Sequence, residues 1–367
     1  MKNFEKKYKI ILFNDSLSGG AGKVILTLAE ILVQHAFDID IVIYENKVDY
    51  AIPESINLHR LNIKKDEIKH KRTIVKALKN EILVSKKVDM IISNSTPSNK
   101  VLSLLNEENI YHCVHSAEIK EHPPTIWGFL KAQWRKQRYK KLYTDKNLIL
   151  VSKQLQTIIE KDIGAKPKSI HLIYNPFDFN KIKYLANHKE GEVCKEAYII
   201  HVGRLDISSK RHDILLEAYK RANIPYRLVI LGTGKDEAKI RQYIEQLHLE
   251  KKVTLAGFQE NPYPWIKQAK LLILTSDFEG LPTVLIEALA LKVPVVSTNC
   301  PTGPKEILEG ELSRYLVPPQ EVEQLASKIQ EATSHYPVIS DKMVEKFDQE
   351  NIVLQYINLI EEINGKE

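Results

Sequence analysis

The stretch from Ser276 to Leu289, SDFEGLPTVLIEAL, decides the fold of this chain. The apolar run 271–274 directly before it predicts a buried parallel strand, and the pattern from Pro282, as first helical residue, predicts a helix. A strand, a short glycine loop and a helix N-terminus together make an anion site, because unpaired backbone amides and the helix dipole point outward. Glu279 in the loop and Glu287 in the helix add two carboxylates, which accept hydrogen bonds from sugar hydroxyls.

Strand and helix patterns alternate along the whole chain, in two similar halves. The strands predicted in the first half are 9–13, 39–44, 90–93, 110–114 and 148–152. Those predicted in the second half are 197–202, 227–231, 253–256, 271–274 and 293–297. Alternation of this kind predicts parallel sheets with right-handed crossovers, and hence two doubly wound domains.

Composition and length agree with two globular domains. The chain has 367 residues, of which 43% are hydrophobic and 27% charged. The basic N-terminus has an apolar core of only four residues, 10–13, which predicts a first strand and no signal peptide, and no run is long enough to span a bilayer. Cys113, Cys194 and Cys300 are too scattered for a disulfide framework or a zinc site, and a cytoplasmic location is expected.

The stretch 276–289, with its F-E-G-L-P core and the downstream P-V-V-S-T-N-C-P-T-G-P-K-E-I-L, resembles the E-x(7)-E signature of the retaining GT-B glycosyltransferases of family four. The resemblance implies a GT-B fold, in which two doubly wound Rossmann-like domains face each other across a cleft. The domains expected are an acceptor-binding domain over 1–177 and a nucleotide-sugar-binding domain over 178–345, joined by a polar linker at 175–194. The last helix, about 346–367 within a helical pattern from 341 to 363, is expected to pack back on the first domain.

The resemblance also implies which residues bind the donor. Glu279 would bind sugar hydroxyls, Glu287 would strengthen donor binding, and Gly280 and Leu281 would line the same loop. The segment after the strand 197–202 resembles the family's G-R-L-x(n)-K-x-x-D element. Its candidates for the donor diphosphate are Gly203, Arg204 and Lys210, with Arg211 able to share or replace Lys210 because the spacing is one residue longer than in many relatives.

Other loops at strand ends supply further candidates. The loop after the first strand fails as a P-loop at Leu17 and Val24, and its glycines do not complete a dinucleotide motif. It resembles instead the family's G-G-A-E-R-V element, so Gly19 and Gly20 would lie near the donor phosphate and the acceptor. Gly22 stands where the family has Glu.

Further candidates lie in other loops, most of which follow predicted strands. His115 ends the strand 110–114 and would lie beside the donor sugar, whereas His112 and Cys113 are expected in the core. Gly234 and Phe258 lie in loops that enclose the nucleotide base in relatives. Residues that either line the cleft or serve the fold are Asn94, Ser95, Asn175, Lys305 and Glu306.

No metal or other cofactor is expected. The pattern Asp38-Ile-Asp40 stands at the start of a predicted strand, at the wrong end of the sheet for a ligand site. Arg204 and Lys210 would carry the phosphate charge in place of a cation.

The mechanism implied by the resemblance is front-face attack, in which the acceptor hydroxyl loses its proton to the departing phosphate. Catalysis then consists of positioning and leaving-group stabilisation. The expected reaction is transfer of a hexose, with retention, from a nucleotide diphosphate sugar, with uridine diphosphate favoured, to a glycan hydroxyl. Two alternatives are a GT-B nucleotide-sugar epimerase and a non-catalytic nucleotide-sugar-binding partner of another transferase.

The net charge of +6 is concentrated in the first half, where residues 1–180 hold 29 Lys and Arg against 20 Asp and Glu. Residues 120–146 hold eight of these cations with Trp127, Phe129 and Trp134 interleaved. Three interpretations are open: docking on an anionic membrane surface, binding of an acidic glycan acceptor, or a solvated helix with buried Trp. Nucleic acid lacks any supporting motif. The favoured acceptor is a lipid-linked lipopolysaccharide, capsule or oligosaccharide precursor at the inner face of the membrane.

Overall fold

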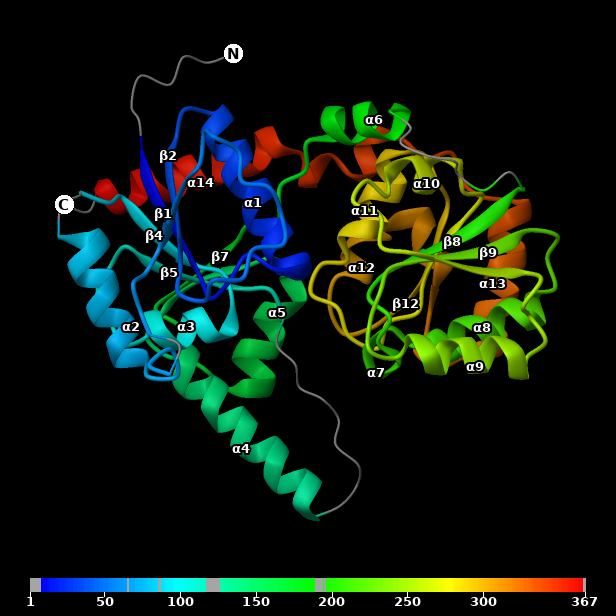
Figure 1. Cartoon of the computed structure of the whole chain (residues 1–367), viewed down its shortest axis with the longest axis horizontal. Coiled ribbons are helices and arrows are strands. Elements are labelled where there is room, and N and C mark those ends of the chain that lie inside the picture. The colour runs from blue at the N-terminus through cyan, green and yellow to red at the C-terminus, as the bar shows by residue number, and fades with distance from the viewer. Residues whose placement is uncertain are drawn as a thin grey trace. The chain divides into compact units, whose positions relative to one another are not determined.

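The computed structural model describes residues 8–64, 66–84, 87–116, 126–188, 194 and 196–365. The chain divides into two compact units, one formed by Met1–Phe177 with Gln349–Glu367 and the other by Asp178–Asp348. Figure 1 shows a twisted sheet with helices packed against it in each unit.

The described residues of the first unit form a seven-stranded parallel sheet in the order β3-β2-β1-β4-β5-β6-β7. Its strands are β1 (Lys9–Asn14), β2 (Asp38–Ile43), β3 (Asn57–Arg60), β4 (Met90–Ser93), β5 (Ile110–Val114), β6 (Asn147–Leu150) and β7 (Ser169–Leu172). Its helices are α1 (Gly19–Gln34), α2 (Lys71–Leu78), η1 (Lys79–Leu83), α3 (Thr96–Leu102), α4 (Ile126–Tyr143), α5 (Lys153–Thr157), η2 (Ile158–Ile163) and α14 (Gln349–Asn364).

The described residues of the second unit form a six-stranded parallel sheet in the order β10-β9-β8-β11-β12-β13. Its strands are β8 (Tyr198–Val202), β9 (Arg227–Leu231), β10 (Val253–Gly257), β11 (Leu272–Leu274), β12 (Val295–Thr298) and β13 (Leu316–Val317). Its helices are α6 (Phe179–Asn187), α7 (Ile207–Lys210), α8 (His212–Ala222), α9 (Glu237–Gln246), α10 (Tyr263–Gln268), α11 (Thr283–Ala290), α12 (Pro304–Ile307), η3 (Gly310–Tyr315), α13 (Val322–Ser334), η4 (Asp341–Met343) and η5 (Glu345–Phe347).

The central strands are buried because helices cover both faces of each parallel sheet. All six residues of β1 and all three of β11 are buried. Helix α8 has the opposite pattern, since it buries Leu215, Leu216 and Tyr219 against the sheet and exposes its charged side chains. These features confirm the predicted fold class, two Rossmann-like α/β units.

Three details differ from the sequence-based prediction. The stretch 175–194, predicted as a linker, contains the helix α6. The Asn261 side-chain amide contacts this helix by donating to the Leu185 carbonyl at 3.0 Å. The closing helical pattern begins with two 3₁₀ turns, and the α-helix itself starts only at Gln349. Pro282 caps α11, whose first helical residue is Thr283.

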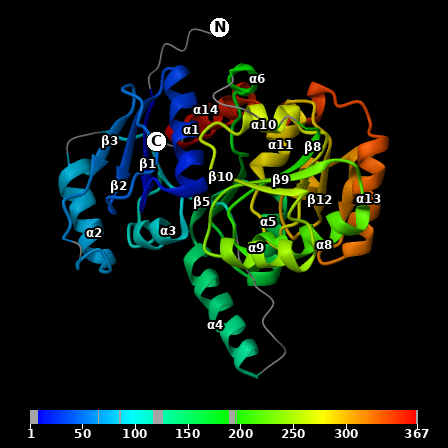
Figure 2. The same ribbon diagram turned by 45° about the vertical axis from the view of Figure 1, so that its right-hand side comes forward.

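Helix α4 extends away from the sheet of its own unit in both views, and its buried end lies at Leu142 and Tyr143 (Figures 1 and 2). Within the described part of the chain, no helix is both long and apolar enough to cross a bilayer.

Candidate active site

The strand order of the second unit reverses between β8 and β11, which are neighbours although two strands separate them in sequence. Ligands of doubly wound sheets bind beyond the carboxyl ends of the strands at such a switch point. The loop after β8 carries Arg204, the short helix α7 that follows it ends with Lys210, and the loop after β11 carries Glu279. The topology therefore brings Arg204 and Lys210 to the same end of the sheet as Glu279, which comes about 70 positions later in the chain.

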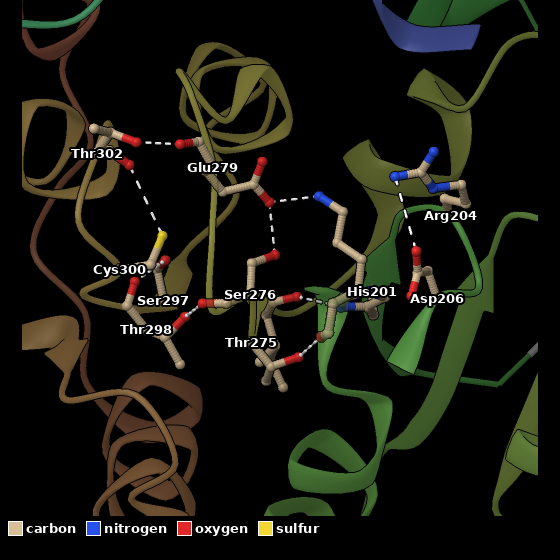
Figure 3. A network of polar contacts seen from close by, with 12 residues as sticks. His201, Arg204, Asp206, Thr275, Ser276, Glu279, Ser297, Thr298, Cys300 and Thr302 are labelled. Carbon is tan, nitrogen blue, oxygen red and sulfur yellow. Dashed lines mark hydrogen bonds and ion pairs between the residues drawn. The ribbon is translucent and has the colours of Figure 1, made fainter. Parts of the chain in front are cut away.

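Lys210 and Glu279 form an ion pair, with 2.5 Å between Nζ and Oε1. Figure 3 shows Glu279 in the network of polar contacts around it. Their side chains are 18% and 13% exposed, so the pair is reachable from solvent yet mostly shielded. The Arg204 side chain is 71% exposed and its guanidinium lies 4.0 Å from Asp206. Two cations and one carboxylate at a switch point make a site suited to a ligand with both phosphate and hydroxyl groups.

Arg211 has a different environment from Lys210. Its guanidinium donates to both oxygens of Asp213 and, at 3.0 Å, to Asp277 of the loop after β11. These partners raise the pKa of Arg211, and its backbone has φ +51°, in the left-handed region. Arg211 thus ties the two loops together, and Lys210 is the better candidate for a phosphate ligand.

The glycine loops beside the site need glycine for close backbone approach. A Cβ atom at Gly234 would collide with the backbone of Leu205, and one at Gly232 would collide with the Gly203 carbonyl. The Leu205 amide donates to the Thr233 carbonyl at 3.0 Å, which joins the loops after β8 and β9. Sequence reasoning placed Gly203 and Gly234 at the site but did not reveal that the loops carrying them are in contact.

Phe258 follows β10 and is 63% exposed, so its ring is accessible to a ligand. Leu281 is buried, so only its backbone can line the site. Gly280 packs against Gly303, where a Cβ atom would lie 2.5 Å from the Gly280 oxygen. The segment around Gly303 therefore supports the loop that carries Glu279.

Glu287 lies in α11 and reaches Tyr263 of α10. The pKa of the Tyr263 phenol is raised, first by burial and then by the Glu287 carboxylate, to which it hydrogen-bonds. Tyr263 was not predicted as a site residue, because nothing in its local sequence shows that α10 lies beside α11. Lys305 is exposed, while Glu306 is buried in α12.

In the first unit, Gly19 and Gly20 are the first two residues of α1. The Gly19 amide donates to Asp49 at 3.0 Å, so a carboxylate already lies at this helix N-terminus. A Cβ atom at Gly22 would lie 2.5 Å from the Leu17 carbonyl carbon, which explains why this chain cannot carry the family's Glu there.

His115 comes directly after β5 and is half-buried, with Nε2 3.4 Å from the Cys113 sulfur. Desolvation lowers its pKa to about 4, so the ring is neutral at pH 7 and can exchange hydrogen bonds but not a charge. His112 and Cys113 are buried, as predicted for core residues, and His112 contacts the Ser93 hydroxyl at 3.1 Å.

Loops also meet at the switch point of the first sheet, between β1 and β4. Ser95 caps α3 by accepting from the Ser98 amide, and its hydroxyl donates to Asp15 of the loop after β1 at 2.5 Å. Asn94 is buried and donates to the Ile92 carbonyl at 3.2 Å. Asn94 and Ser95 thus have structural partners inside their own unit, and Asn175 is half-buried in the segment before α6.

Comparison with known proteins places the chain in a family. Residues 18–181 match the model of Glycosyltransferase Family 4, and residues 185–351 match that of Glycosyl transferases group 1. A relative from Campylobacter jejuni is 31% identical over 82% of this chain and 83% of its own length. It is an N-acetylgalactosamine-N,N'-diacetylbacillosaminyl-diphospho-undecaprenol 4-alpha-N-acetylgalactosaminyltransferase.

The chain is a glycosyltransferase of this family. Lipopolysaccharide 1,6-galactosyltransferase of Escherichia coli is 28% identical to this glycosyltransferase over 58% of the chain and 61% of the relative. Sucrose-phosphate synthase of Thermosynechococcus elongatus superposes with a TM-score of 0.78 at 20% identity, over 98% and 100% of the two chains. HepE of Anabaena, crystallised with UDP and glucose, gives a TM-score of 0.70 at 18% identity, over 97% and 100%. These structures show the GT-B fold.

The Asp38-Ile-Asp40 pattern of the glycosyltransferase has a protein cation as its partner. The Lys9 ammonium lies 3.0 Å from Asp38 and 2.8 Å from Asp40, across the β1–β2 pair. Asp40 is fully buried, so this ion pair serves the sheet. Among the described residues, no group of three or more His, Cys, Asp or Glu side chains is placed to hold a metal ion.

Proposed function

We propose that this glycosyltransferase transfers a hexose from a UDP-sugar, with retention, to a hydroxyl of a growing lipid-linked glycan. The observation that carries the proposal is the Lys210–Glu279 ion pair at the β8–β11 switch point, with the exposed Arg204 beside it. HepE, of the same fold, was crystallised with UDP and glucose. The C. jejuni relative is named for a diphospho-undecaprenol acceptor.

Each charged group then has a role in the chemistry. Lys210 and Arg204 bind the diphosphate and stabilise the negative charge that grows on it as the glycosidic bond breaks. Glu279 accepts hydrogen bonds from the sugar hydroxyls, and Glu287 strengthens binding of the nucleotide part. The acceptor hydroxyl attacks from the face that the diphosphate leaves and passes its proton to the departing phosphate oxygen, so the bonds and protons balance without an enzyme nucleophile.

Burial lowers the pKa of His115 to about 4, so in this chemistry its ring would act as a neutral hydrogen-bonding group. No divalent cation is required, because two protein cations supply the positive charge at the diphosphate. An epimerase or a non-catalytic binding partner would transfer no sugar to an acceptor, which the assay with acceptor distinguishes.

The test is nucleoside diphosphate release from a panel of UDP-, GDP- and ADP-sugars, with chelator present and without acceptor. We expect slow release from one UDP-hexose, and its loss in Glu279→Ala with nucleotide binding retained. Product from an acceptor-bearing assay should keep the anomeric configuration of the donor. Absence of both release and thermal stabilisation by any nucleotide would remove the donor-site assignment, and release that requires added Mg²⁺ or Mn²⁺ would contradict the metal-independent mechanism.

We further propose that α4 docks on an anionic bilayer, where a lipid-linked acceptor resides. The helix contains six Lys and Arg and no Asp or Glu. Spacings of three and four residues place one stripe along its length, made of Trp127, Leu130, Lys131, Trp134, Arg138 and Lys141, and all six are exposed. Residues 120–125 of the segment predicted to dock lie outside the described residues.

The stripe changes character along the helix. Its first half is apolar, with Trp127 79% and Trp134 62% exposed, which excludes the interpretation of a solvated helix with buried Trp. Its second half is cationic, and the Arg138 guanidinium stacks on the Trp134 ring at 4.5 Å. Trp side chains favour the bilayer interface, and each nearby cation adds about 1 kcal/mol of attraction to anionic lipid.

Vesicle co-sedimentation tests this surface. Binding to vesicles of phosphatidylglycerol and phosphatidylcholine should exceed binding to phosphatidylcholine alone, and Trp127→Ser with Trp134→Ser should weaken it at least tenfold. Val338→Ser, which removes a side chain 89% exposed in the second unit, is the matched control and should bind as the wild type does. Equal binding to both vesicle types, or binding of an acidic glycan by α4 in place of vesicles, would contradict the membrane proposal.

A further inference from the structure

The Glu279 carboxylate is held by one of its two oxygens. Among the described residues, Lys210 Nζ contacts Oε1 at 2.5 Å and the Ser276 hydroxyl donates to the same Oε1 at 2.6 Å. Figure 3 shows the hydrogen bond between Ser276 and Glu279. Oε2 takes part in neither contact. The carboxylate is therefore oriented, with one oxygen anchored in the protein and the other available to a ligand.

Ser276 is itself rigidly placed. It is fully buried two residues after β11, and its carbonyl accepts a 2.6 Å hydrogen bond from the Thr298 hydroxyl of β12. At the other end of the same short loop, the Thr302 hydroxyl donates to the Glu279 carbonyl. Because both ends of the segment 276–279 are fixed to β12 and the loop after it, the Ser276 hydroxyl meets Glu279 in a defined direction.

A further hydrogen bond holds the backbone of Lys210 and does not involve its side chain. The Thr275 hydroxyl donates to the Lys210 carbonyl at 2.7 Å, so consecutive residues at the end of β11 contact both members of the ion pair. Thr275 holds only the backbone of Lys210, whereas Ser276 contacts the reactive group of Glu279. The ammonium of Lys210 thus stays able to turn from Glu279 to another anion.

We infer that Ser276 is a positioning residue for the transfer reaction and acts through Glu279. The inference rests on the proposed function, in which the donor diphosphate competes with Glu279 for the Lys210 ammonium. As Lys210 turns to the diphosphate, the Ser276 hydroxyl becomes the donor that keeps Oε1 in place. Oε2 then accepts a hydrogen bond from a hydroxyl of the transferred sugar, at the position where the sugar must be held during bond breaking.

This role predicts a specific kinetic pattern for Ser276→Ala. Turnover of the UDP-hexose should fall 10- to 100-fold, because a misdirected carboxylate fails mainly in the transition state. Affinity for UDP, measured by calorimetry, should stay within twofold, since UDP carries no sugar for Glu279 to bind. Ser276→Cys, which keeps the side-chain volume and a weak donor, should lie between the wild type and Ser276→Ala.

A double-mutant cycle separates positioning from a general loss of structure. If Ser276 acts only through the Glu279 carboxylate, Ser276→Ala should cause no further loss of turnover when added to Glu279→Gln. The matched control is Ser297→Ala, which removes a hydroxyl that is equally buried and bonded to the Thr298 carbonyl at 2.9 Å. The control should have wild-type turnover and UDP affinity.

The outcomes distinguish the two proposals. Wild-type protein that neither binds UDP nor turns over any donor would overturn the proposed function, and this inference with it. An active wild type whose Ser276→Ala and Ser276→Cys variants keep full turnover would overturn the inference alone. Independent, multiplicative losses in Ser276→Ala/Glu279→Gln, or an equal loss in Ser297→Ala, would show a merely structural role for Ser276.

Discussion

Gly303 allows a quantitative test of how the Glu279 loop is supported. Its backbone has φ +86° and ψ −58°, a conformation that side-chain-bearing residues rarely adopt. A Cβ atom there would collide with Pro282 Cδ and lie 2.5 Å from the Gly280 oxygen, one residue from Glu279. Gly303→Ala must therefore push the loop away from the segment that carries Thr302.

The cost has two parts, backbone strain and overpacking. Each is about 1–3 kcal/mol, so we expect Gly303→Ala to lower the free energy of unfolding of the second unit by about 2–6 kcal/mol. Gly310 is the matched control, because its φ is +57° and a Cβ atom would meet nothing within 4 Å. Gly310→Ala should cost only the left-handed backbone strain, about 1 kcal/mol.

The assay is urea unfolding followed by the fluorescence of Trp265, which lies in α10 of the second unit. A Trp127→Phe/Trp134→Phe background removes the other two of the three tryptophans and isolates this unit from the first. Turnover measured on the same variants should fall at least tenfold in Gly303→Ala and stay within twofold in Gly310→Ala. Equal stabilities for the two variants, with unchanged turnover in Gly303→Ala, would refute the reasoning.

Two further predictions concern charged groups beside the site. Lys210→Met should lower UDP affinity, measured by calorimetry, at least tenfold with little loss of stability. Arg211→Met should mainly lower the melting temperature, because the partners of Arg211 are Asp213 and Asp277. The reverse result in calorimetry and thermal melts would exchange the roles of the two residues. His212 is buried, neither ring nitrogen has a hydrogen-bond partner among the described residues, and burial followed by the Lys210 charge lowers its pKa to about 4. A depressed histidine pKa means that the unfolded chain binds the proton more tightly than the folded chain does. The contribution of neutral His212 to the free energy of unfolding is therefore complete above pH 6.5, and it decreases by about 3 kcal/mol as the pH falls toward 4. His212→Leu should flatten the measured dependence of unfolding free energy on pH in that window, and an unchanged slope would contradict the assignment.

Local sequence predicted the central strands because their signal is itself local. Strands β4, β5 and β9 have the predicted bounds, since buried parallel strands are short, continuous apolar runs. The edge strands β3, β7 and β13 were missed. A segment such as Asn57-Leu-His-Arg60 is half-exposed and has no apolar run, and it becomes a strand only through pairing with a neighbouring strand.

Helix α6 was taken for a linker for a related reason. Its sequence, FNKIKYLAN, is short and mixes polar with apolar residues. Its helical state depends on the Asp178 cap, which accepts from the Lys181 amide, and on contact with the loop before α10. The cap is visible in the sequence, but the contact is not. A short amphipathic helix gains most of its stability from packing, which a local pattern cannot contain.

The sequence by itself determined the class of this protein. Two series of alternating strands and helices, with the F-E-G-L-P loop at a strand-to-helix junction, specify two Rossmann-like units and name Arg204, Lys210, Glu279 and Glu287 as candidates. Periodicity and glycine loops are local properties, so they can be recognised from the sequence alone.

Only the tertiary structure decided which partner each candidate side chain has. Lys210 and Arg211 are adjacent cations in sequence, yet one faces Glu279 and the other is held between Asp213 and Asp277. Ser276 became visible only through its contact with Glu279. The physical reason is that hydrogen bonds and ion pairs join side chains from different strands, so their partners are set by strand order and register and not by spacing along the chain.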